Sequence, residues 1–132
     1  MKIFLNEDHR KKFHEYIGRV SKERKNSTEY QSLLFLLSSN EDIVNHIDDV
    51  FNFEESGIEP YSYSNHGWQT SSSLKTTRLA YNLFNNNRLD GSGSEENMDL
   101  TILDIFDNHS YYLYAVAIGI RLGNISIDEM SR

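Results

Sequence analysis

The sequence predicts an all-α fold, an irregular compact bundle of five or six helices with one long, ordered, aromatic loop. Apolar residues recur at helical spacing along most of the chain, and residues that favour helix N-caps precede several of these segments. The only proline, Pro60, lies with Gly57 in a long segment that lacks a helical period. A length of 132 residues suits one domain. We therefore expect a single helical domain over residues 1–123 and a C-terminal tail over 124–132.

The first half of the chain predicts three helices, each preceded by a residue that favours an N-cap. The second of these helices has so wide an apolar stripe that we expect it at the centre of the core. The short link that follows it favours an antiparallel pair with the third helix. The expected spans are 7–21 after Asn6, 28–37 after Ser27 or Thr28, and Asn40 to about Phe53, with a polar loop over 21–27.

The second half predicts an aromatic loop over residues 54–69, which we expect to pack over the helices, and then three further helices. The last helix is apolar nearly all round, so we expect it to be buried, either inside the bundle or in a homodimer interface. Gly123 is expected to end it. The expected spans are 71–85 after Thr70 or Ser71, a short helix from Asp99 or Thr101 to about Phe106, and 111–122.

Charge is distributed in blocks. The formal net charge is −7, and residues 29–60 contain eight acids and neither Lys nor Arg. Such a surface repels nucleic acid and attracts basic partners, so we expect no direct nucleic-acid binding. The absence of cysteine excludes disulfides and thiolate catalysis and is typical of a cytoplasmic protein. No apolar run is long enough to span a membrane.

The segment around the only tryptophan contains a candidate ligand site. Backbone N–H groups at a helix N-terminus attract anions, hydroxyl and cationic side chains add to that attraction, and an indole ring can stack on a base. A phosphate, nucleotide or carboxylate is the ligand that this combination would bind. The alternative is that the hydroxyl residues only cap the helix and that the indole covers the core. The candidate residues are Trp68, Thr70, Ser71, Ser72, Lys75 and Arg78.

Catalytic and metal-binding patterns are weaker. His66 is the candidate acid–base residue, with Glu54, Glu55 and Glu59 as nearby carboxylates, but no nucleophile stands at a defined spacing from it. Asp42, His46 and Asp49 would share one face of the third predicted helix, and three such ligands can begin a metal site. Because no fourth ligand is evident, we predict no metal and no cofactor.

Three stretches resemble a small family of bacterial proteins of unknown function, found in Firmicutes and in their phages and mobile elements. The stretches are Phe4-Leu5-Asn6 with His9, Phe53-Glu54 leading through Ile58 and Pro60 to Gly67-Trp68-Gln69-Thr70-Ser71, and Arg78-Leu79-Ala80-Tyr81-Asn82-Leu83. The resemblance covers residues 3 to about 122. It implies no activity, but a phage context implies interference with a host process.

We therefore expect a non-enzymatic protein that binds and modulates a host protein, such as a defence protein. An acidic face that imitates nucleic acid is one mode by which it could bind. Its candidate partner-binding residues are Glu41, Asp42, Asp48, Asp49, Glu54 and Glu55. The alternatives are a small-ligand module at the helix start after Trp68 and an enzyme centred on His66.

Overall fold

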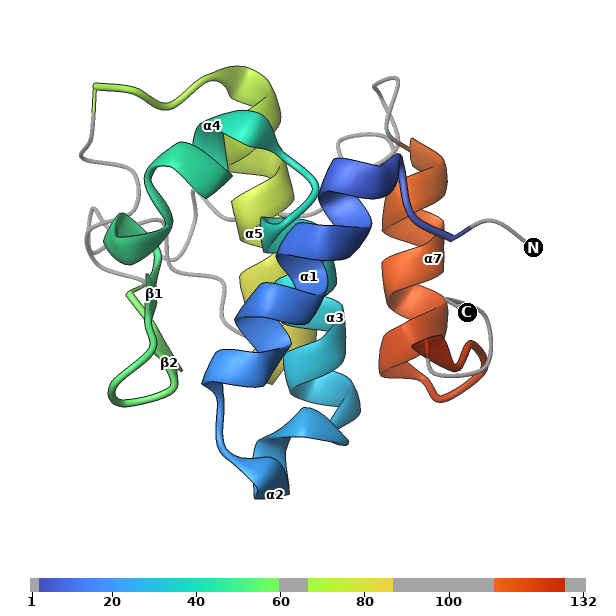
Figure 1. Cartoon of the computed structure of the whole chain (residues 1–132). Helices are drawn as coiled ribbons and strands as arrows, with labels where there is room; N and C mark the ends of the chain where they lie inside the picture. Colours follow the sequence, from blue (N-terminus) through green and yellow to red (C-terminus); the bar gives the residue numbers. More distant parts are fainter. Residues whose placement is uncertain (1–2, 60–66, 87–110, 128–132) are drawn as a thin grey trace.

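The all-α fold is confirmed by a computed structural model, which describes residues 3–59, 67–86 and 111–127. Figure 1 shows a compact group of helices with one short hairpin at its side. The described elements are α1 (Glu7–Arg19), α2 (Lys22–Lys25), α3 (Thr28–Leu37), α4 (Glu41–Asn45), the 3-10 turn η1 (Ile47–Asp49), β1 (Phe51–Asn52), β2 (Gly57–Ile58), α5 (Ser71–Asn85) and α7 (Tyr111–Arg121).

Helix α3 lies at the centre of the core, as its apolar stripe predicts. Its last five residues, Leu33–Leu37, have no solvent-accessible surface. Helices α1, α5 and α7 all contact α3 and surround it (Figure 1). Burial of five consecutive large side chains removes them from water on every side of the helix, which is a large hydrophobic contribution to folding.

The predicted helix starts are confirmed by their capping bonds. The side chains of Asn6, Ser27, Asn40 and Thr70 each accept a hydrogen bond from a backbone N–H in the first turn of the helix that follows. These bonds satisfy N–H groups that have no partner within the helix. At the other end of the chain, Gly123 has φ +80° just after α7, a conformation that favours glycine, and so ends that helix as predicted.

The third predicted helix, expected to run to Phe53, ends much earlier. Helix α4 stops at Asn45, and the chain continues as η1 and the hairpin, in which Phe51 pairs with Ile58. His46 explains the break. Its backbone N–H bonds Ile43 O at 3.0 Å, while its ring Nδ1–H donates to Asp42 O at 3.0 Å. In a continuing α-helix, the backbone N–H of His46 would donate to the carbonyl of Asp42. Here the imidazole donates to that carbonyl instead.

The expected loop over 21–27 contains the single-turn helix α2. Gln31 in α3 donates from Nε2 to the carbonyl of Lys25, the last residue of α2, at 3.0 Å. This bond from a neighbouring helix supports a turn that its own sequence does not indicate.

Several other predictions lie outside the described residues, including the short helix near residues 99–106 and residues 60–66 of the aromatic loop. The boundary at 123 stays a prediction, although Ile127 beyond it is buried. None of the described helices is long and apolar enough to cross a bilayer.

His9 joins the start of α1 to α3. Its side chain is 3% exposed. Leu5 N–H donates to Nδ1 at 3.0 Å, and the opposite ring nitrogen, Nε2–H, donates to Phe35 O at 2.8 Å. Both nitrogens are therefore used by a neutral ring. Burial lowers the pKa of His9 to about 4, against a smaller raising effect of the bond to Phe35.

This buried imidazole predicts a loss of stability in acid. Between pH 6.5, the ordinary pKa of histidine, and about pH 4, the unfolded chain binds a proton at His9 that the folded chain does not bind. The contribution is therefore present above pH 6.5 and is lost as the pH falls, by about 3 kcal/mol in total. We expect urea unfolding at a series of pH values to show this loss in wild type. The His9→Gln protein should lack it, so the difference in unfolding free energy between the two proteins should change as the pH falls. Equal pH dependence of the two proteins would contradict a buried neutral His9.

Candidate functional site

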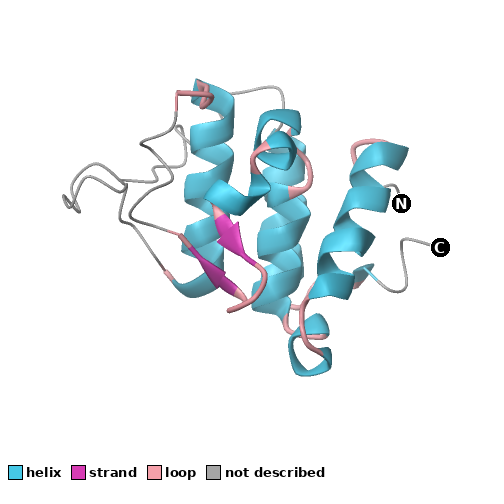
Figure 2. Ribbon diagram, turned by 60° about the vertical axis from the view of Figure 1, so that its left-hand side comes forward, coloured by secondary structure: helices cyan, strands magenta, loops and turns pink. Residues whose placement is uncertain are grey.

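The acidic segment, residues 41–59, forms one side of the molecule. It comprises α4, η1 and the hairpin, which follow one another along that side in Figure 1, and Figure 2 shows the two strands in front of the helices. It contains seven acids and neither Lys nor Arg. Among the six predicted partner-binding acids, Glu41, Asp48, Glu54 and Glu55 are exposed, whereas Asp42 and Asp49 are half-buried.

Trp68, which precedes α5, packs against this segment. Its indole N–H donates to Asp49 Oδ2 at 2.9 Å. Its ring stacks on the imidazole of His46, with centroids 4.5 Å apart and planes 4° apart. One face of the indole and its only polar atom are therefore used by contacts within the protein.

The start of α5 is joined to the start of α4. Thr70 and Ser73 form a capping box, in which each side chain accepts from the other residue's backbone N–H. The Thr70 hydroxyl also donates to Asp42 Oδ2 at 3.4 Å, and Asn40 Nδ2 donates to Ser72 Oγ at 3.3 Å. The structure thus brings together two sets of residues that the sequence analysis treated separately.

The predicted ligand-binding residues do not gather at one place. Trp68 and Thr70 contact the acidic segment, while Ser71, Lys75 and Arg78 share a face of α5 by their spacing of four and three residues. Ser71 is exposed, and Lys75 and Arg78 are half-buried. A carboxylate beside Thr70 repels an anion at this helix start, so the local charge does not favour phosphate binding there.

The candidate metal ligands do not assemble. Because α4 ends at Asn45, the helical spacing that would align Asp42, His46 and Asp49 on one face is lost. Within 3–59, 67–86 and 111–127, no group of three or more His, Cys, Asp or Glu side chains is placed to hold a metal ion. His66, the candidate acid–base residue, lies outside the described residues.

Gln69 belongs to a stretch that carries the family resemblance, but the sequence assigns it no role. Both polar atoms of its carboxamide are buried and have no hydrogen-bond partner among the residues that the structure describes. A buried amide without partners costs about 1–3 kcal/mol. The sequence does not indicate that this side chain is buried, because its burial depends on how the start of α5 packs. Its position between Trp68 and Thr70 is the only signal.

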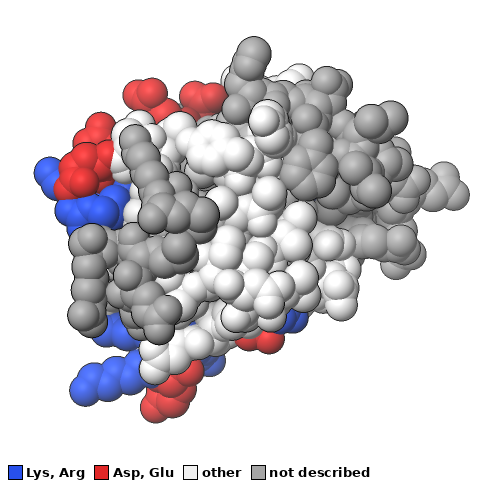
Figure 3. Space-filling view, turned by 90° about the vertical axis from the view of Figure 1, so that its right-hand side faces the viewer, with Lys and Arg blue, Asp and Glu red and all other residues white. Residues whose placement is uncertain are grey.

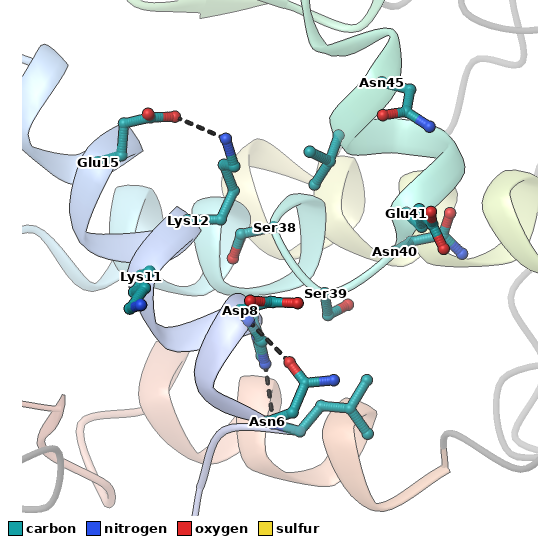
Figure 4. A pocket seen from close by; sticks show the side chains of 13 residues that line it. Asn6, Asp8, Lys11, Lys12, Glu15, Ser38, Ser39, Asn40, Glu41 and Asn45 are labelled. Atoms are coloured by element: carbon teal, nitrogen blue, oxygen red, sulfur yellow. Dashed lines mark hydrogen bonds and ion pairs between the residues drawn. The ribbon is translucent and has the colours of Figure 1, made fainter.

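A hollow of about 710 Å³ adjoins the acidic segment between the first half of α1 and the junction of α3 with α4 (Figure 4). Its lining carries both signs of charge: Lys11 and Lys12 beside Asp8, Glu15 and Glu41. Lys12 Nζ is paired with Glu15 Oε2 at 3.1 Å. With two lysines and three carboxylates, the lining has a small net negative charge and does not favour an anion.

Sequence comparison places the chain in a family. A family model described as "Family of unknown function (DUF6075)" matches residues 1–131. The chain belongs to this family. No curated protein and no solved structure matches the chain. The predicted membership of a family of unknown function is confirmed for this DUF6075 protein, and the predicted occurrence in Firmicutes and their phages stays a prediction.

The bond between Trp68 and Asp49 predicts unequal effects at two adjacent aspartates. Asp49→Ala leaves the indole N–H without its acceptor, and we expect a loss of about 1–2 kcal/mol in unfolding free energy with altered fluorescence of the only tryptophan. The control Asp48→Ala removes an exposed carboxylate and should change stability by less than about 0.5 kcal/mol. Urea unfolding followed by tryptophan emission measures both, and equal effects would contradict the contact.

The unpartnered amide predicts a stabilising substitution. Gln69→Met keeps a side chain of similar length and removes two buried polar atoms, so we expect the unfolding free energy to rise by about 1 kcal/mol. Gln31→Met is the matched control, because it removes the bond to Lys25 O and should destabilise the protein by a similar amount. Thermal and urea unfolding measure the two shifts. A destabilised Gln69→Met protein would show that this amide has partners.

Proposed function

We propose that this protein is a non-enzymatic protein-binding module whose acidic segment binds a basic surface of a partner protein. The observation that carries the proposal is the exposure of Glu41, Asp48, Glu54 and Glu55 on a segment without Lys or Arg. Carboxylates of one sign on a connected surface attract a basic partner and raise its rate of association.

The anchoring of the acidic segment supports a binding role. Three contacts fasten it to α3, α5 and the residues before α5: Tyr30 OH donates to Ser56 O at 2.6 Å, Tyr81 OH donates to Val50 O at 2.5 Å, and Trp68 bonds Asp49. A surface held in one conformation loses little entropy when a partner binds. The exposed carboxylates are therefore presented at fixed positions rather than on a free tail.

The chemistry of the acidic segment suits a partner that ordinarily binds nucleic acid, because such proteins carry basic surfaces shaped for an array of negative charges. A host defence protein that recognises nucleic acid is a partner of this kind. The phage or mobile-element origin rests on the family resemblance, and the cytoplasmic location rests on the absence of cysteine. The module as proposed uses no metal or cofactor.

A charge-reversal series tests this proposal. Asp48→Lys/Glu54→Lys/Glu55→Lys and the control Asp8→Lys/Glu15→Lys/Glu23→Lys each change the net charge from −7 to −1, since each substitution adds two units. All six carboxylates are exposed, but the control acids lie on α1 and α2. We expect the first variant to bind the partner captured from a nuclease-treated host lysate at least about tenfold more weakly than wild type, and the control to bind as wild type does.

Competition with duplex DNA tests the class of the partner. If the acidic segment occupies a nucleic-acid site, DNA should displace the wild-type protein from its purified partner. Equal binding by both triple variants would refute the role of the acidic segment. A captured partner that DNA does not displace would refute the imitation of nucleic acid while leaving charge-based binding in place.

A further inference from the structure

Arg19, the last residue of α1, stacks on Phe53 of the acidic segment. Its guanidinium carbon lies 3.7 Å from the centre of the Phe53 ring, which is the geometry of a cation–π contact. The ring is held in place by Tyr16 and Phe51, whose ring centres lie 5.4 Å and 4.8 Å from its own. Phe53 is half-buried and Arg19 is exposed, so the guanidinium covers the ring on its solvent side.

The contact with the ring is the one that holds the guanidinium of Arg19. Within the part of the chain that the structure describes, Arg19 has no hydrogen bond or ion pair. Glu15 stands four residues earlier, a spacing that ordinarily favours an ion pair, but it accepts from Lys12 at 3.1 Å. Arg10, by contrast, donates to Glu7 at 2.9 Å. Because a single cation–π contact at an exposed site is weak, a second guanidinium can displace Arg19 from the ring.

Exposed carboxylates adjoin the Phe53 ring. Glu54 follows Phe53 in the chain, and Asp48 lies near Tyr16, which packs on the ring. Burial, the largest effect, raises the pKa of the Tyr16 hydroxyl to about 12; among the nearby charges, Asp48 adds to this rise and Arg19 opposes it. Asp48 and Arg19 therefore both lie within electrostatic reach of the same tyrosine.

We propose that the solvent side of Phe53 is a guanidinium site, and that an arginine of the basic partner displaces Arg19 from it. An aromatic face beside carboxylates suits arginine better than lysine, because the planar guanidinium stacks on the ring and also donates to carboxylates. Arg19, which is fixed to α1, makes the first of these contacts without the second. An arginine that approaches from solvent can make both, so in the free protein Arg19 competes with the partner for the ring.

This inference rests on the proposed function and adds to it the side chain that the partner must present. In Figure 1 the C-terminal half of α1 lies beside the hairpin, which places the Phe53 ring at an edge of the acidic segment. Figure 3 looks onto the side of the molecule away from the hairpin and shows an uncharged surface at its centre. The side that contains the carboxylates is therefore the one that attracts a basic partner.

Binding of two defined peptides, nona-arginine and nona-lysine, tests the inference. Arg19→Ala and the control Lys11→Ala each remove one exposed cation from α1, which changes the net charge from −7 to −8. We expect Arg19→Ala to bind nona-arginine about fivefold more tightly than wild type does, and nona-lysine with nearly unchanged affinity. Lys11→Ala should bind both peptides as wild type does. Isothermal titration calorimetry at physiological ionic strength measures the dissociation constants.

Removal of the ring provides a second test. Phe53→Leu keeps an apolar side chain, and its combination with Arg19→Ala should abolish the gain in affinity for nona-arginine. N-acetyl-arginine amide gives a readout that does not depend on this double variant. At millimolar concentration it should shift the NMR signals of the Phe53 ring in the Arg19→Ala protein, whereas N-acetyl-lysine amide should not.

Equal gains for Arg19→Ala and Lys11→Ala, equal gains for the two peptides, or no gain at all would overturn the guanidinium site. None of these results would alter the outcome of the charge-reversal series, because that series replaces carboxylates and leaves Arg19 and Phe53 in place. Conversely, a charge-reversed protein that keeps its partner would refute the proposed function, while the peptide measurements would still decide whether the ring binds arginine.

Discussion

Complete burial of α3 is the constraint on which the rest of the fold depends. A helix with five consecutive inaccessible residues, Leu33–Leu37, needs neighbours on every side, and α1, α5 and α7 supply them. Near its C-terminal end, the carbonyl of Phe35 has its partner in His9 of α1. The buried hydroxyls of Thr76 and Tyr114 share a 2.8 Å hydrogen bond, because an unpaired buried hydroxyl would be costly.

The irregular conformation of the acidic segment follows from its attachment to α5. Residues 46–52 contain several weak helix formers, and side chains in this stretch bond outside the helical pattern. His46 bonds back to Asp42 and stacks on Trp68, and Asp49 accepts from the indole of Trp68. The first of these bonds takes up a carbonyl that a continuing helix would use, and the other two contacts join the segment to Trp68. The result is a carboxylate-rich surface whose backbone is held without a long helix.

The surface proposed for binding acts through its charge. The acidic segment attracts basic groups over a distance set by ionic strength. It lies on the opposite side of α3 from α7 (Figure 1).

The sequence by itself determined the fold class, the starts of the helices and the central place of α3. Caps such as Asn40 and Thr70, and the apolar period of a helix, act within a few residues and can be read from them directly. Within the candidate site, the sequence identified the acids and the tryptophan as separate sets. Only the tertiary structure decided that Trp68 stacks on His46, that its indole N–H bonds Asp49, and that the Gln69 amide is buried. These features arise between residues that are distant in the chain, where packing overrides the local preference for a helix.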